Sequence, residues 1–297
     1  ACARCARRAS SHTASTQCRR MRWCISMVST IGSDPSLNIL KSKPMTIHDE
    51  PIEIAVDDQQ IEARLIAGVS AGPAVLFVHG WGGNQQQYLN RARAVAELGF
   101  ICLTFDLRGH APSDGQRELV SREDNLRDLL AAYDVLASQP GCDAASLGVV
   151  GSSYGAYLAA ILTSERAVGW LALRAPALYN DAGWELPKRQ LHEDPDFRAY
   201  RRRVVAPGEN RALRACAAFF GDVLVVESEQ DDVVPHPVIA NYLAAFTRAR
   251  SLTHRLIKDA DHGLTDVSWQ RTSTSFLLQW LADRVIDAGA GVTYARE

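Results

Sequence analysis

The stretch Gly151-Ser152-Ser153-Tyr154-Gly155 decides the fold of this chain. It follows the apolar run 146–150 and precedes a second apolar run, 156–162. This is a G-x-S-x-G pattern between an expected strand and an expected helix, an arrangement that forces the serine into a tight, strained and exposed turn. A Cβ atom at either glycine would collide with neighbouring backbone in so sharp a turn.

Outward from this turn, strand-like and helix-like segments alternate from residue 45 onward. Period-two alternation over 52–66 predicts an antiparallel hairpin with one solvated face. Continuous apolar runs typical of buried parallel strands follow at 74–78, 100–105, 146–150, 170–173, 222–226 and 253–257. Helices are expected between them at 87–98, 122–138, 154–165, 211–219, 237–247 and 269–286. The pattern predicts an α/β fold with a mostly parallel, eight-stranded, doubly wound sheet.

Residues from about 174 to 221 break this rhythm and contain several prolines. So long an insertion after a strand is typical of a cap over a site, and we expect a short cap insertion here. The triplet Arg201-Arg202-Arg203 within it is interpreted as a solvated face. Apart from this insertion, residues 45–297 are expected to form one domain.

The first 44 residues differ from the rest of the chain. They are rich in Arg, Ser, Thr and Cys and hold one acidic residue, Asp34. We expect a disordered N-terminal extension outside the fold. Three interpretations compete: a stretch upstream of a true start at Met45, an organelle transit peptide, or, less favoured, a secretory signal.

Composition excludes several classes of function. The formal net charge of −2 gives no electrostatic case for binding nucleic acid or an anionic membrane. No run approaches 18 apolar residues, so no transmembrane helix is expected. Cys102, Cys142 and Cys216 lie scattered in the main body, which favours a reducing, cytoplasmic compartment over a disulfide framework. Cys2-Ala3-Arg4-Cys5 resembles half of a zinc site, but no second pair completes it.

A serine hydroxyl becomes a good nucleophile only when an oriented base removes its proton. His262 follows the eighth predicted strand and Asp231 follows the seventh, so both open onto the edge of the sheet where the turn at Ser153 lies. We predict a catalytic triad of Ser153, Asp231 and His262. Asp232 also fits the role of the acid, and Asp261 ranks third because neighbours in a turn tend to point apart.

Acyl transfer also needs N–H donors aimed at the developing oxyanion, each worth roughly 2.7–4 kcal/mol. The backbone N–H of Tyr154, the residue after the serine, is one predicted donor. The backbone N–H of Trp81, in the glycine-rich loop 79–84, is the other. The Trp81 ring would line the acyl pocket or pack structurally. No metal or organic cofactor is implied, because these groups suffice for hydrolysis.

Together these motifs resemble the serine α/β-hydrolases. The signatures fall in the order expected for that family, over about residues 50 to 285, and comprise His79-Gly80-Trp81-Gly82-Gly83, Asp106-Leu107-Arg108-Gly109-His110 with Ser113-Asp114-Gly115, 151–155, Asp231-Asp232-Val233-Val234-Pro235 and Asp261-His262-Gly263. The family spacing to Pro235 favours Asp231 over Asp232. The Ser-Tyr-Gly elbow is most similar to the esterase, dienelactone-hydrolase-like and prolyl-oligopeptidase-like branch. Ala111-Pro112 and Ala156 depart from the family pattern and predict a stiffer loop and looser helix packing, respectively.

The resemblance implies a serine hydrolase that cleaves carboxylic esters of small molecules through an acyl-enzyme intermediate. The alternative is a small aminopeptidase or amidase, or a thioesterase, with the same triad. A non-catalytic binding protein would lack a triad member. Serine at 153, in place of cysteine or aspartate, argues against dienelactone hydrolysis and against dehalogenase or epoxide hydrolase chemistry. Activity is expected to fall below about pH 6.5, where an ordinary imidazole becomes protonated.

Overall fold

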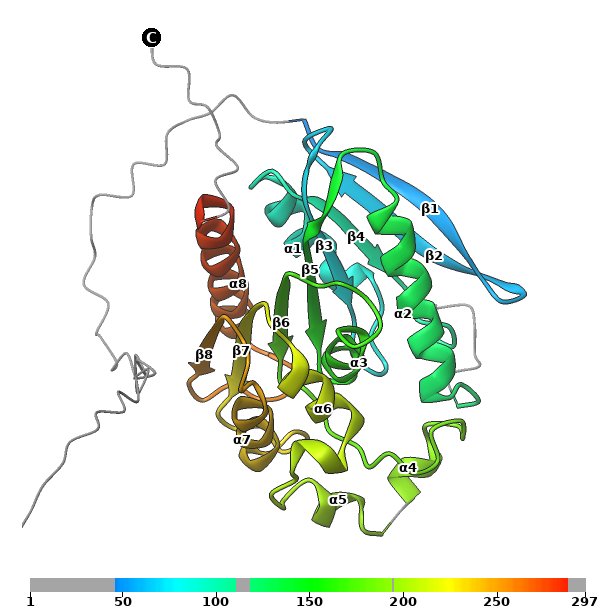
Figure 1. Ribbon diagram of the computed structural model, residues 1–297, viewed down its shortest axis with the longest axis vertical. Helices are drawn as coiled ribbons and strands as arrows, with labels where there is room; N and C mark the ends of the chain where they lie inside the picture. The colour runs from blue at the N-terminus through cyan, green and yellow to red at the C-terminus, as the bar shows by residue number, and fades with distance from the viewer. Residues whose placement is uncertain (1–45, 111–117, 194, 288–297) are drawn as a thin grey trace, which may run out of the picture. The chain divides into compact units, whose positions relative to one another are not determined.

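The sheet of this chain is built from strands that alternate with helices (Figure 1). The computed structural model describes residues 46–110, 118–193 and 195–287. Within these ranges the strands are β1 (His48–Val56), β2 (Gln59–Ala67), β3 (Gly72–Val78), β4 (Ile101–Phe105), β5 (Cys142–Ser152), β6 (Trp170–Arg174), β7 (Asp222–Ser228) and β8 (Ser251–Ile257). They form one eight-stranded sheet in the order β1-β2-β4-β3-β5-β6-β7-β8. Only the β1–β2 and β2–β4 pairs are antiparallel, so the predicted mostly parallel sheet is confirmed.

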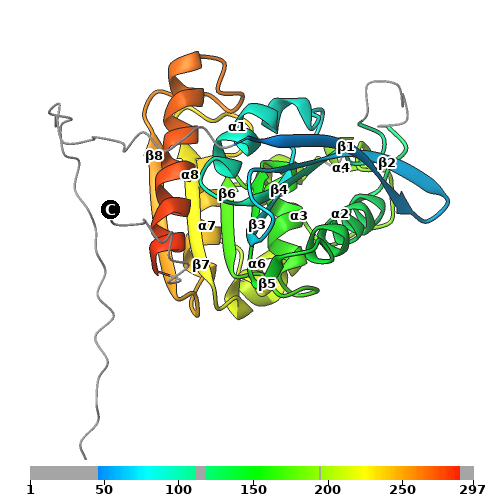
Figure 2. The ribbon, with the colours of Figure 1, turned by 90° about the horizontal axis from the view of Figure 1, so that it is seen from above.

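Helices cover both faces of the sheet, as Figures 1 and 2 show. One face packs against α1 (Gln86–Ala96) and α8 (Val267–Asp287), and the other against α2 (Arg122–Ala137), α3 (Tyr154–Leu162), α6 (Arg211–Ala218) and α7 (His236–Ala245). Strand β3 shows the consequence for the sequence. Leu76 lies in the core with α2 and α3, whereas its neighbours Val75 and Phe77 lie in the core with α1 and α8. Both faces of a central strand are buried, and its sequence is therefore continuously apolar.

The insertion between β6 and β7 contains α4 (Gln190–Glu193), α5 (Phe197–Tyr200), the 3₁₀ helix η1 (Pro207–Glu209) and α6. The prediction that the arginine triplet is solvated is wrong for Arg201, which is buried, and holds for the exposed Arg202 and Arg203. The Arg201 guanidinium donates to the carbonyl oxygens of Leu178 (3.1 Å) and Val233 (2.7 Å). Two acceptors of this kind compensate the cost of burying the charge.

Several predictions fall outside the described residues. They concern the extension at 1–44, the stiffening effect of Ala111-Pro112, and the motif Ser113-Asp114-Gly115. The division into an extension and a single domain with a cap therefore stays a prediction. Among the described helices, none combines the length and apolar character that crossing a bilayer requires.

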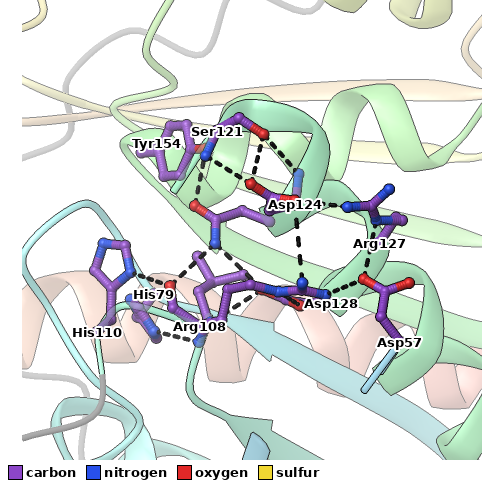
Figure 3. A network of polar contacts seen from close by, with 11 residues as sticks. Asp57, His79, Arg108, His110, Ser121, Asp124, Arg127, Asp128 and Tyr154 are labelled. Atoms are coloured by element: carbon purple, nitrogen blue, oxygen red, sulfur yellow. Dashed lines mark hydrogen bonds and ion pairs between the residues drawn. The ribbon is translucent and has the colours of Figure 1, made fainter. Parts of the chain in front are cut away.

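A polar network fixes the loop after β4 against α2 (Figure 3). The Arg108 side chain donates to Asp128 Oδ1 at 2.6 Å, and its backbone N–H donates to Oδ2 at 2.9 Å. Asn125 donates to the Arg108 carbonyl (3.2 Å) and accepts from the Tyr154 hydroxyl (3.1 Å). Asp128 is fully buried, and burial raises its pKa against the opposing attraction of the guanidinium. The network connects the loop after β4 to the first residue of α3.

Replacing Arg108 with Met should lower the free energy of unfolding by about 3–5 kcal/mol, because Asp128 would then be a buried charge without its ion-pair partner. Arg127→Met is the matched control. Arg127 also forms ion pairs with Asp57 and Asp124, but its side chain is 45% exposed, and its loss should cost at most about 1 kcal/mol. Urea unfolding of both variants measures the difference. Equal losses would contradict this account of the network.

Candidate active site

Ser153 lies in the turn between β5 and α3, with φ 52° and ψ −114°. A non-glycine residue rarely adopts a positive φ, and such strain costs about 1–3 kcal/mol. The two flanking glycines leave no space for a side chain. A Cβ on Gly151 would lie 2.6 Å from Ala156 Cα, and one on Gly155 would lie 2.5 Å from the Val78 carbonyl oxygen. The sharp strand-to-helix turn expected from the sequence is thus the observed one.

The three predicted catalytic side chains meet at this turn. His262, between β8 and α8, places Nε2 3.0 Å from Ser153 Oγ. Its Nδ1 lies 2.7 Å from Oδ2 of Asp231, which follows β7. Since a carboxylate can only accept, Nδ1 carries the proton and Nε2 is available to accept from the serine hydroxyl. This arrangement can activate a hydroxyl as a nucleophile.

Asp231 is the carboxylate that reaches the histidine. Its Oδ1 accepts from the backbone N–H groups of Val233 (2.9 Å) and Val234 (2.7 Å), which orients Oδ2 toward His262. The alternative Asp232 is exposed. The other alternative, Asp261, accepts instead from the backbone N–H of Thr265 at 3.1 Å.

The glycine-rich loop after β3 lies directly beside the elbow. A Cβ on Gly80 would lie 3.3 Å from the Ser152 carbonyl oxygen and 3.4 Å from Ser153 Cβ. His79 anchors this loop: Nε2 accepts from Leu107 N–H (3.0 Å), so Nδ1 carries the hydrogen donated to the Gly80 carbonyl (2.8 Å). Burial lowers the pKa of His79 to about 4, which keeps it neutral. Its role is structural.

Of the two predicted oxyanion donors, Tyr154 directly follows the nucleophile and Trp81 lies in the glycine-rich loop beside it. Tyr154 opens α3, where first-turn N–H groups lack partners within the helix. Trp81 follows Gly80, and its ring packs edge-on against the rings of Tyr154 (5.4 Å between centroids) and His110 (4.6 Å). The packing interpretation of the Trp81 ring is therefore favoured.

Lys188, in the insertion, lies over these rings although it is only 1% exposed. Its Nζ is 4.0 Å from the Trp81 ring centroid, 4.9 Å from that of Tyr154 and 5.1 Å from that of Tyr179. Burial lowers the pKa of Lys188. Cation–π attraction in so dry a site is worth about 2 kcal/mol, and it holds the insertion against the glycine-rich loop after β3.

Sequence reasoning missed Lys188, Asn125 and Arg174 as parts of this site. Asn125 and Lys188 carry no motif, and each acts through a long-range contact with an aromatic residue. Arg174 ends a buried strand, and a charge directly after an apolar run at the edge where ligands bind was the available signal. Among the described residues, no group of three His, Cys, Asp or Glu side chains could hold a metal ion.

Comparisons with known proteins agree with this geometry. The family model described as serine aminopeptidase, S33, matches residues 70–193. The solved structure of Est1E from Butyrivibrio proteoclasticus, with ferulic acid bound, superposes with a TM-score of 0.63 at 17% identity, over 79% of this chain and 99% of its own. The chain has the α/β-hydrolase fold.

Two curated relatives match part of this chain. An uncharacterized protein of Mycobacterium tuberculosis is 29% identical over 181 residues, 59% of this chain and 58% of the relative. Thiohydrolase aneE of Aspergillus aculeatus is 31% identical over 102 residues, 34% of this chain and 32% of its own. The chain thus spans less than two thirds of either relative. Family and fold together support a serine hydrolase.

The hydrogen bond between Asp231 and His262 predicts that replacing one carboxylate oxygen of Asp231 has a large effect on kcat. Asp231→Asn should lower kcat about 10⁴-fold while the protein stays folded, because an amide donates where the imidazole N–H needs an acceptor. Asp232→Asn, the matched control one residue away, should keep wild-type kcat. Steady-state ester hydrolysis and thermal unfolding of both variants test this. A larger loss in the Asp232 variant would reverse the assignment.

Proposed function

We propose that this α/β-hydrolase cleaves carboxylic esters of small molecules through a Ser153–His262–Asp231 triad. The observation that carries the proposal is the pair of hydrogen-bond distances, 3.0 Å from Ser153 Oγ to His262 Nε2 and 2.7 Å from His262 Nδ1 to Asp231 Oδ2. The esterase-like fold, with a ferulic-acid-bound neighbour, supports esters as the substrate class. The scattered cysteines support a cytoplasmic location, and the net charge gives no reason to expect a nucleic acid or membrane partner.

In the proposed mechanism, Ser153 Oγ attacks the ester carbonyl carbon while His262 Nε2 takes the hydroxyl proton. Asp231 holds the Nδ1–H and stabilises the imidazolium that forms. The backbone N–H groups of Trp81 and Tyr154 donate to the oxyanion of the tetrahedral intermediate. His262 then returns the proton to the leaving alcohol, and the acyl group stays on Ser153. Water, deprotonated by His262, attacks this acyl-enzyme and releases the acid.

Two findings favour a different leaving group on the same machinery. The family model is described as an aminopeptidase, and one relative is named a thiohydrolase. An amide or a thioester is therefore the second candidate substrate. Esters rank above amides because an alkoxide leaves more readily than an amide nitrogen. They rank above thioesters because the thiohydrolase relative matches only 34% of this chain.

A matched substrate panel separates these candidates. Wild-type protein and Ser153→Ala are assayed with p-nitrophenyl acyl esters, amino-acid p-nitroanilides and acyl thioesters of equal acyl chain. We expect the highest kcat/KM on esters and about a 10⁶-fold loss of kcat in the variant. A fluorophosphonate probe should label Ser153 in the wild type only. A preference for anilides or thioesters overturns the ester assignment, and turnover retained by Ser153→Ala overturns the triad.

A further inference from the structure

Arg174, the last residue of β6, contacts the segments that carry Ser153 and His262. One terminal nitrogen, Nη1, donates to Ser152 Oγ at 3.2 Å, directly before the nucleophile. The other, Nη2, donates to Ser228 Oγ at 3.2 Å. The same Nη2 donates to the backbone carbonyl of His262 and lies 3.5 Å from that of Asp261. One guanidinium therefore connects the ends of β5 and β7 to the loop that carries the base.

The backbone of Arg174 holds the nucleophile as well. Its carbonyl oxygen accepts from Ser153 N–H at 2.9 Å. The next residue, Ala175, has a φ of 42° and donates to the Val226 carbonyl at 2.8 Å. The chain thus turns sharply at the point where it contacts both members of the proposed nucleophile–base pair.

Placing the Arg174 guanidinium here costs solvation free energy. Burial lowers the pKa of the Arg174 guanidinium, although the charges of Asp231 and Asp261 oppose this shift, and among the described residues no carboxylate lies within ion-pair distance of it. Its Nε is buried without a hydrogen-bond partner, and the side chain lines a small cavity of about 20 Å³ that Arg91 also lines. Removing even part of a guanidinium from water costs solvation free energy. A hydrophobic residue would fill the space at lower cost, so stability alone does not explain the arginine.

We propose that Arg174 is a positioning residue that holds the His262 loop so that Nε2 stays within hydrogen-bond distance of Ser153 Oγ. Ala260 and Leu264 anchor this loop in the core, whereas Gly263 and Thr265 are exposed. The planar fork of a guanidinium carries donors on separate nitrogens and so reaches acceptors on different loops, whereas all three donors of lysine lie on one nitrogen. A displacement of the imidazole by about 1 Å costs about 10²-fold in rate. This inference rests on the proposed triad function.

The test compares Arg174→Lys and Arg174→Met with Arg91→Met in the full chain. Lysine keeps the charge but not the span, so we expect kcat for p-nitrophenyl acetate to fall 10- to 100-fold, with KM within about twofold and an unchanged melting temperature. The rate of fluorophosphonate labelling at Ser153 should fall in the same proportion. Arg91→Met removes a charge beside the same cavity, from a side chain that donates to Thr274, and should leave kcat unchanged.

The outcomes separate this inference from the proposed function. If wild-type protein is labelled at Ser153 and hydrolyses esters, but Arg174→Lys keeps wild-type kcat, the positioning role is wrong and the triad stands. An equal loss of kcat in Arg91→Met also overturns the positioning role, because any charge beside the cavity would then explain the effect of Arg174. Failure of labelling in the wild type refutes the triad itself. If Arg174→Met does not fold, the lysine variant alone decides.

Discussion

Backbone hydrogen bonds from two directions hold Ser153 in its left-handed conformation. Its N–H donates to the Arg174 carbonyl at 2.9 Å, and its carbonyl accepts from Tyr157 at 3.1 Å and Ala177 at 3.0 Å. A strained residue persists only where its surroundings over-determine it. The two glycines of the elbow, the β3 loop and the start of α3 are arranged around this one backbone conformation. The serine hydroxyl points to the edge of the sheet as a result.

Buried and half-buried arginines donate to backbone carbonyls at this end of the sheet. Buried Arg201 donates to Leu178 and Val233, and buried Arg122 donates to Asn180 and Ala182. Half-buried Arg174 donates to the carbonyl of His262. Irregular loops leave carbonyl oxygens without partners in a regular ladder, and a buried acceptor must be satisfied. Arginine suits this task because it offers five donors in a fixed plane. These side chains fix the loops that a sheet alone would leave loose.

The sequence was sufficient to predict the strands and the elbow, because both rest on local constraints. Strand β3 must be apolar on both faces, and Gly151 can hold no side chain. The choice between Asp231 and Asp232 depends on which side chain faces His262. The backbone of the tight turn after β7 determines this direction. A charge at the end of an apolar run marks the position of Arg174, but its contacts could not be predicted, because its partners are mainly backbone groups and serine hydroxyls far away in the sequence. The burial of Arg201 was mispredicted for the same reason.

Lys188 links the insertion between β6 and β7 to the glycine-rich loop after β3. Its backbone N–H donates to the Val120 carbonyl at 2.9 Å, while its ammonium lies 4.0 Å from the Trp81 ring. A change in length or sequence around Lys188 would also shift the loop that carries Trp81. The insertion between β6 and β7 is thereby coupled to a loop in which Gly80 and Gly83 leave little space for a side chain. A change of shape in the insertion would therefore need a matching change around Trp81.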